Sequence, residues 1–171
     1  MGVTIHFEGQ VRDEENYEKL LAEVVAFADN YGMEYSEIDD QIRTLSRVKD
    51  EKDWDYTGPV KGIKIILHEN CDPLNLEFDK DLYIQEYVKT QFVGAEAHII
   101  LVELLRDFQK YFSSFQVEDE GEYWETNDKS VLEDHISTVD KLIDERLAED
   151  PNLTGPVRSP SGRILDLVTR G

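Results

Sequence analysis

Hydrophobic periodicity is clearest at the N-terminal end of the chain. Residues 3–8 alternate apolar and polar side chains, which is the pattern of a β-strand with one buried face. From Asp13, a good N-cap residue, to Tyr31 the apolar residues recur at helical spacing. Gly32 follows, at the position where a left-handed C-cap is common. The pattern therefore predicts a strand and then an amphipathic helix.

The middle of the chain has the pattern of short strands separated by turns. Apolar residues alternate with polar ones, and clusters of Asp, Asn, Gly and Pro interrupt them. We expect a turn at Asp39-Asp40 and a charged loop over residues 49–59. The predicted strands cover residues 33–37, 42–48, 62–68 and 74–78, and the last two form a hairpin.

Helical spacing returns after residue 80. Tyr83, Tyr87 and a later series of apolar residues predict a long helix over residues 81–112. Gly94 lies inside this pattern, and glycine destabilises a helix interior by about 1 kcal/mol relative to alanine. We therefore expect the helix either to bend at this position or to be divided in two, and we expect a short strand at 116–118.

The C-terminal part is predicted to be one acidic helix and a tail. Asn127-Asp128 supplies an N-cap, and Pro151 ends the helical pattern. The turn-forming residues beyond it precede a candidate edge strand. We expect residues 1–150 to form a single α+β domain and residues 151–171 to form its C-terminal tail.

The order of these elements is β-α-β-β-β-β-α. Consecutive strands usually pair as antiparallel neighbours, which predicts an α+β fold. The simplest arrangement is one antiparallel sheet of four to six strands with two main helices packed on one face. Over about residues 2–112 this order resembles the half-repeat topology of TATA-box-binding-protein-like folds. The resemblance concerns topology, and a shared topology does not imply a shared function.

Charge excludes several classes of partner. The chain has 171 residues and a net charge of −20. Nucleic-acid binding depends on Lys and Arg, and anionic membranes attract basic segments, so we expect neither partner. Residues 113–150 hold thirteen acidic and three basic side chains, whereas residues 151–171 hold three basic and one acidic. The acidic excess is therefore concentrated ahead of a basic tail.

The cellular setting follows from the cysteine count and the hydrophobic runs. Cys71 is the single cysteine, which excludes an intrachain disulfide and favours the cytoplasm. The longest apolar run, residues 97–105, is far shorter than the roughly 20 residues that span a bilayer. The first residues lack the basic segment of a signal peptide.

The polar face of the predicted sheet is the first candidate site. If the alternating apolar residues face the helices, several charged side chains share the opposite face. These side chains either form ordinary cross-strand ion pairs or provide a recognition surface for an anionic ligand or an acidic segment. A metal site at His6, His68 and Glu77 is geometrically possible, but no ligand-spacing motif supports it and we expect no metal. The candidate binding residues on this face are His6, Arg43, Arg47, Lys64, His68 and Glu77.

Two short segments that mix carboxylates with large aromatic residues are the second candidate site. The first contains Trp54 and Tyr56, and the second contains Tyr123 and Trp124. Each segment is either a loop that pins itself to the core by its aromatic side chains or a protein-binding epitope with aromatic anchors inside a charged rim.

No compact catalytic, nucleotide-binding or metal-binding motif is present in the sequence. Cys71 is flanked by Asp72, which would raise a thiol pKa, so cysteine catalysis is not expected. The favoured hypothesis is a non-catalytic, cofactor-free module that binds a basic protein partner. The alternative is a small-molecule-binding or enzymatic domain that uses the polar sheet face, with Tyr83 as an additional candidate, or a pocket between sheet and helix. Neither hypothesis predicts an oligomeric state.

Overall fold

The computed structural model describes residues 2–170 and has an α+β fold with several antiparallel sheets. The first main sheet has the strand order β7-β1-β8 and the second has the order β2-β5-β6. A tight turn at residues 79–82 leads from β6 into β7 and so connects the two sheets. The strands are β1 (Thr4–Val11), β2 (Tyr35–Leu45), β5 (Tyr56–Ile65), β6 (Leu74–Phe78), β7 (Tyr83–Lys89) and β8 (Phe112–Asp119).

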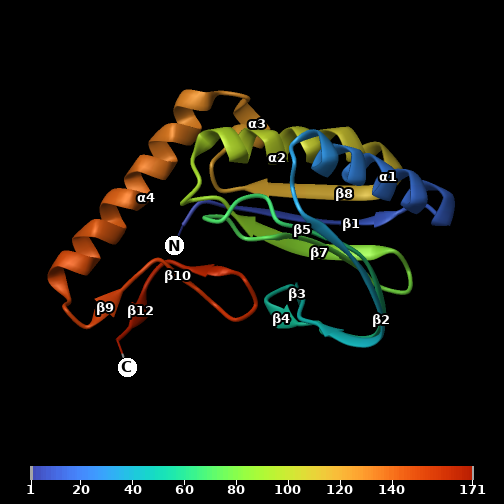
Figure 1. Cartoon of the computed structure of the whole chain (residues 1–171), viewed down its shortest axis with the longest axis horizontal. Coiled ribbons are helices and arrows are strands. Elements are labelled where there is room, and N and C mark those ends of the chain that lie inside the picture. Colours follow the sequence, from blue (N-terminus) through green and yellow to red (C-terminus); the bar gives the residue numbers. More distant parts are fainter. Residues whose placement is uncertain (1, 171) are drawn as a thin grey trace.

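Helices cover one side of the first sheet (Figure 1). Apolar side chains of β1 such as Ile5 and Phe7 pack in the same core as Leu20 of the first helix and Leu101 and Leu105 of the second. Burial of this kind is the main stabilising contribution to a fold of this size. The helices are α1 (Glu14–Asn30), α2 (Ala95–Phe108), a 3₁₀ turn η1 (Gln109–Tyr111), α3 (Tyr123–Thr126) and α4 (Lys129–Glu149).

The opposite side of the first sheet faces two smaller parts of the molecule (Figure 1). One is the end of β2 together with a short hairpin, which we call the arm, residues 44–55. The other is the C-terminal segment, residues 151–170. The short strands in these parts are β3 (Val48–Lys49), β4 (Lys52–Asp53), β9 (Leu153–Thr154), β10 (Val157–Arg158), β11 (Ile164–Leu165) and β12 (Val168–Thr169).

Several predicted elements are confirmed. The N-terminal strand, α1 and β6 lie where the periodicity places them, and β5 pairs with β6 in the predicted hairpin, although β5 covers residues 56–65 and not 62–68. The side chain of Asp13 caps α1 by accepting a hydrogen bond from Asn16 N at 2.8 Å, and Asp128 caps α4 through Ser130 N at 2.9 Å. Helix α4 ends at Glu149, ahead of Pro151. The α+β class is also confirmed.

The predicted turn at Asp39-Asp40 is wrong. Residues 35–45 form one continuous strand, β2, whose pairing with β5 shifts register between Asp40 and Arg43. The extra residues form a bulge, which bends a strand without ending it. The predicted loop at 49–59 is also wrong, because it contains the β3–β4 hairpin and the start of β5.

The predicted long helix at 81–112 is wrong over its first half. Residues 83–89 form β7, which pairs antiparallel with β1, and α2 begins only after Gly94. Tyr83 and Tyr87 are four residues apart, which imitates one face of a helix. The buried residues Leu82, Ile84 and Val88 instead follow the two-residue period of a strand.

The sheet arrangement also differs from the prediction. Two three-stranded sheets replace one sheet of four to six strands, so the resemblance to the TATA-box-binding-protein half-repeat is not confirmed. The candidate edge strand of the tail instead forms two-residue ladders, β9 with β12 and β10 with β11. Among residues 2–170, no helix combines the length and apolar character needed to cross a membrane.

Candidate functional site

An open groove of about 900 Å³ lies between the first sheet, the arm and the C-terminal segment. Its floor is the polar face of β7, β1 and β8, and the arm and Arg163 line its sides. We call it the acidic groove. Six carboxylate side chains line it: Glu8, Asp53, Asp55, Glu77, Glu86 and Glu118.

Cross-strand neighbours set the floor of the groove. His6 lies opposite Tyr87 on one side and Glu118 on the other, and Glu8 lies opposite Gln85. The Tyr83 hydroxyl donates a hydrogen bond to Glu8. Burial, followed by this hydrogen bond and the charge of Glu8, raises the pKa of Tyr83. The tyrosine therefore stays neutral and serves as a hydrogen-bond donor.

Gln85 fastens the arm to the sheet. Its Nε2 donates to Val48 O at 2.8 Å and to Glu8 at 3.2 Å, and its Oε1 accepts from Val48 N at 2.9 Å. The side-chain amide thus matches both backbone groups of one arm residue. This places the acidic residues of the arm along the wall of the groove.

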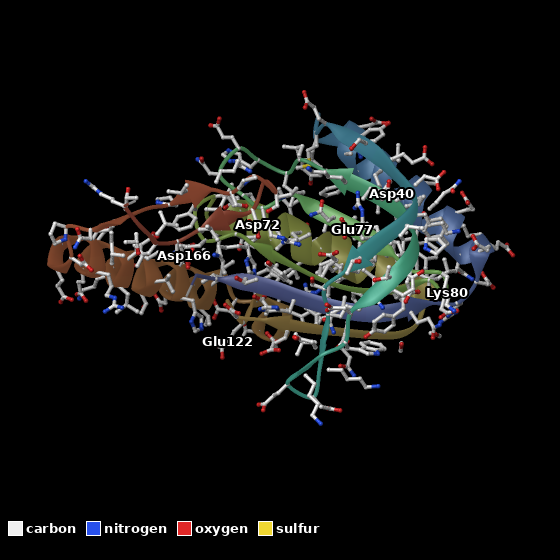
Figure 2. The ribbon with its side chains drawn as sticks, turned by 90° about the horizontal axis from the view of Figure 1, so that it is seen from below. Asp40, Asp72, Glu77, Lys80, Glu122 and Asp166 are labelled. Atoms are coloured by element: carbon white, nitrogen blue, oxygen red, sulfur yellow. The ribbon has the colours of Figure 1, made fainter. Side chains whose placement is uncertain are left out.

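A row of charged residues crosses the molecule where the acidic groove meets a second groove of about 800 Å³. Arg43 reaches Asp40 at 2.7 Å and Glu77 at 2.9 Å. Arg163 reaches Glu86 at 3.0 Å and Asp72 at 3.5 Å. Figure 2 shows the carboxylates Asp40, Glu77 and Asp72 following one another from β2 toward the C-terminal segment. We call this row, Asp40, Arg43, Glu77, Glu86, Arg163 and Asp72, the ionic row.

Glu86 is the most perturbed acid of the groove. Its side chain is 8% exposed and lies in β7 between the buried residues Ile84 and Val88. Burial is the largest cause that raises the pKa of Glu86 to about 8, and the neighbouring charge of Glu77 raises it further against the opposing effect of Arg163.

Arg47 is enclosed at the other end of the groove. It is 4% exposed, and its guanidinium carbon lies 5.6, 5.3 and 5.0 Å from the ring centres of Trp54, Tyr56 and Tyr83. Its Nη1 forms a buried ion pair with Asp79 at 3.0 Å. The aromatic residues of the first acidic segment therefore hold an arginine of the same chain.

The cations of the groove are neutralised, whereas four of its acids are not. Arg47 and Arg163 both have carboxylate partners. Within residues 2–170, no Lys, Arg or His lies within ion-pair distance of the remaining four acids. These four are Glu8, Asp53, Asp55 and Glu118. The groove therefore carries a net negative charge that faces solvent.

The structure brings most of the predicted sheet-face residues together. His6, Arg47 and Glu77 line the acidic groove, and Arg43, Lys64 and Glu77 line the second groove. His6 pairs with Glu120 at 2.8 Å. His68 lies apart, on an exposed loop, where its Nδ1 accepts a hydrogen bond from Asn70 N. Arg43 and Arg47 form ion pairs with acids, so this face is not cationic.

The predicted metal set is not assembled. His6 and His68 have the separate partners just described, and no group of three metal-binding side chains is placed to hold an ion in the described part of the chain. Cys71 is buried, and burial followed by the charge of Asp72 raises the pKa of its thiol to about 12.

The second acidic segment belongs to the core. Tyr123 is 8% exposed, and Trp124 is half-buried with its ring edge-on to Phe115. Arg106 of α2 lies over both rings and donates hydrogen bonds to both carbonyl groups. Helix α3, which carries these residues, lies across the sheet from the arm that carries Trp54 (Figure 1). The four aromatic candidates therefore do not form one surface.

A buried Thr-His-Asp arrangement lies beneath this segment. His98 Nδ1 is 2.6 Å from the Thr90 hydroxyl, and His98 Nε2 is 3.0 Å from Asp119 Oδ2. Such a set is known from nucleophilic catalysis, which requires access to substrate. Thr90 and His98 have no exposed surface, so the arrangement is structural.

Sequence reasoning missed Glu86, Arg163 and Asp72. Glu86 was assigned to a helix, although it interrupts the alternation of Leu82, Ile84 and Val88 at an inward position. A charged residue at such a position is a signal that could have identified it. No comparable signal exists for Arg163, because its partner Glu86 lies 77 residues away in the sequence.

Comparisons with protein families, curated proteins and solved structures found no match to this chain. The candidate site therefore stands on its geometry and charge.

Proposed function

We propose that the protein binds a basic segment of a protein partner in the acidic groove, without catalysis. The observation that carries the proposal is the charge of the groove. Six carboxylates line it, and the two arginines among them are already neutralised. A cationic segment would supply the counter-charges that Glu8, Asp53, Asp55 and Glu118 lack.

The field of the whole molecule acts in the same direction. A net charge of −20 attracts a basic partner over several ångströms and accelerates its association. The concave shape adds to this effect, since low-dielectric walls concentrate the field inside a cleft. Tyr87 lines the groove, is half exposed and already carries the guanidinium of Arg163 over its ring, so the groove contains an aromatic surface suited to a cationic side chain.

The enzymatic alternative has less support from the geometry. Glu86, which lies beside Glu77, has the raised pKa expected of a proton donor. However, Arg43 and Arg163 already bind these carboxyl groups, and Glu86 is almost completely covered. A substrate would therefore have to displace an arginine before it reached the pair.

The test uses two labelled eight-residue probes, one with lysine at every second position and one with glutamine in place of lysine. Fluorescence anisotropy is measured at low salt and at about 0.3 M salt, where the screening length is only a few ångströms. We expect the lysine probe to bind at low salt, to weaken at high salt, and to bind far more tightly than the glutamine probe.

Two matched variants locate the site. The groove variant combines Glu8→Gln, Asp53→Asn, Asp55→Asn and Glu118→Gln. The control variant combines Glu133→Gln, Asp144→Asn, Glu145→Gln and Glu149→Gln, which are exposed residues of α4. Both variants have the same net charge. We expect the groove variant to lose at least tenfold in affinity and the control to lose less than threefold. Equal losses would contradict the proposal, because they would show attraction by net charge alone.

A further inference from the structure

The C-terminal segment already places one guanidinium group in the acidic groove. Arg163 Nη2 binds Glu86 at 3.0 Å, and Nη1 donates to Tyr87 O at 2.8 Å and lies 3.5 Å from Asp72. Its guanidinium carbon is 3.9 Å from the centre of the Tyr87 ring. We call Asp72, Glu86 and Tyr87 the guanidinium clamp.

These contacts are specific to an arginine. A planar guanidinium directs several N–H groups to separate acceptors while it stacks on an aromatic ring. A lysine ammonium is a point charge, which can either bond to such acceptors or lie over the ring. The clamp offers two carboxyl groups, one carbonyl oxygen and one ring face, and together these match the contacts that a guanidinium group can make at once.

Arg163 is presented to the clamp from a tight turn. Ser159 N donates to Arg163 O at 2.7 Å, and Gly162 N donates to Ser159 O at 2.9 Å. The short strands β10 and β11 flank this turn. The arginine thus enters the groove as a side chain of a hairpin, which is how a loop of a separate protein would present one.

The segment also has the charge expected of the partner. Residues 151–170 contain three arginines and one acidic residue, whereas residues 1–150 contain fifteen basic and thirty-seven acidic side chains. A basic stretch of the chain therefore lies on an acidic body. The proposed function requires the same arrangement, in which a basic segment of the partner lies on the acidic groove.

The arginine can leave the clamp without the segment leaving the body. Ile164 N binds Asp72 at 2.7 Å, and Lys89 Nζ binds Ile164 O at 3.0 Å and Asp166 at 2.9 Å. These contacts hold the segment independently of the Arg163 side chain, which is 20% exposed. A rotation of that side chain opens the clamp.

We propose that the guanidinium clamp is a subsite of the acidic groove, in which an arginine presented by a turn of the partner replaces Arg163. This inference rests on the proposed function and names the chemistry that the partner must carry. Arg163 then acts as an internal competitor that lowers the apparent affinity by the fraction of time it fills the clamp.

The experiment measures binding of a synthetic peptide with the sequence of residues 157–165 to the full chain. Two further peptides carry lysine or citrulline in place of Arg163, since citrulline keeps the shape and loses the charge. The protein is compared as wild type, Arg163→Ala and Arg170→Ala. Arg170 is an exposed arginine of the same segment that lies outside the turn presenting Arg163, so its variant loses the same charge without disturbing the clamp.

We expect Arg163→Ala to bind the arginine peptide about tenfold more tightly than the wild type and Arg170→Ala do. The lysine and citrulline peptides should not show this gain. An Arg163→Lys protein, with its charge retained, should lie between wild type and Arg163→Ala. Thermal unfolding of each variant confirms that the fold is retained.

Three outcomes overturn the inference. Equal binding of the arginine peptide to wild type and Arg163→Ala would show that Arg163 is not a competitor. An equal gain for the arginine and lysine peptides would show a general cation site, which leaves the proposed function intact. A concentration-dependent dimer that disappears in Arg163→Ala would show that the clamp receives the tail of a second copy. Failure of the lysine probe at low salt would instead contradict the proposed function itself.

Discussion

The two aromatic-acidic segments have similar compositions and opposite structural roles. In the first, Arg47 is buried, and Trp54, which stacks against it, is 41% exposed. In the second, Tyr123 is buried, and the arginine over it, Arg106, is only partly covered. In each segment an arginine lies over aromatic rings. The buried member is the arginine in the first segment and the tyrosine ring in the second. The contribution of such a pair to stability therefore depends on which member is removed from water.

The largest expected effect is at Arg47. Its replacement by alanine leaves Asp79 buried without its counter-charge, and breaking a buried ion pair in this way costs about 3–5 kcal/mol. The matched variant Arg106→Ala should lose about 1 kcal/mol, because its hydrogen bonds lie closer to solvent. Urea unfolding of both variants measures the difference. Equal losses in the free energy of unfolding would contradict this comparison, because they would show that the two arginines contribute equally to stability.

The next effect concerns the aromatic side chains. Tyr123→Ala removes a core side chain and should lower the free energy of unfolding by about 3 kcal/mol. Trp54→Ala removes a half-exposed ring and should lower it by about 1 kcal/mol. Thermal or urea unfolding gives both values. The reverse order would show that the first segment, and not the second, anchors the core.

Two buried carboxyl groups should make the stability of the protein depend on pH in opposite directions. Burial raises the pKa of Glu86 to about 8, so the folded state holds a proton that the unfolded state loses near pH 4.5. Stability therefore falls as the pH rises from about 4.5 to 8. Glu86→Gln, which is neutral throughout, should remove this decline. An unchanged decline in the variant would assign it to other groups.

Asp119 should show the opposite dependence. Burial by itself raises the pKa of Asp119, but the hydrogen bond and charge of His98 and the N–H groups of Trp124 and Gly121 lower it below 3.8. Its contribution is complete above pH 3.8 and is lost as the pH falls through the folded-state pKa. Asp119→Asn should therefore flatten the acid limb of the stability curve and leave the limb above pH 4.5 unchanged.

The smallest expected effect separates the two tryptophans by solvent contact. In the single-tryptophan variants Trp124→Phe and Trp54→Phe, acrylamide should quench Trp54 more strongly than Trp124. Trp54 is half exposed at the arm, whereas Trp124 packs edge-on against Phe115. Similar quenching constants would contradict the assignment of the two segments to surface and core.

Local patterns were sufficient for elements whose partners are close in sequence. The strand at β1, helix α1 and the β5–β6 hairpin follow from two- and 3.6-residue periods and from caps such as Asp13 and Asp128. The helix predicted over residues 83–89 failed because Tyr83 and Tyr87 have helical spacing, whereas pairing with β1 decided the strand. Tertiary contacts commonly override local preference in this way.

The candidate site was predictable only in part, because tertiary contacts also decide which of its residues meet. His6, Arg43, Arg47, Lys64 and Glu77 were placed near one another because alternation identifies the polar face of a strand. Their ion pairs could not be predicted, since Arg43 and Glu77 are 34 residues apart and strand neighbours decide which charges meet.

The sequence by itself determined the charge, the buried faces of β1, β5 and β6, and the ends of α1 and α4, because these depend on residues a few positions apart. Only the tertiary structure decided that Trp124 is partly covered and Trp54 open, and that Glu86 and Arg163 share one site. Those outcomes depend on which distant segments remove a side chain from water. The same removal from water sets the pKa of Glu86 and the strength of each ion pair.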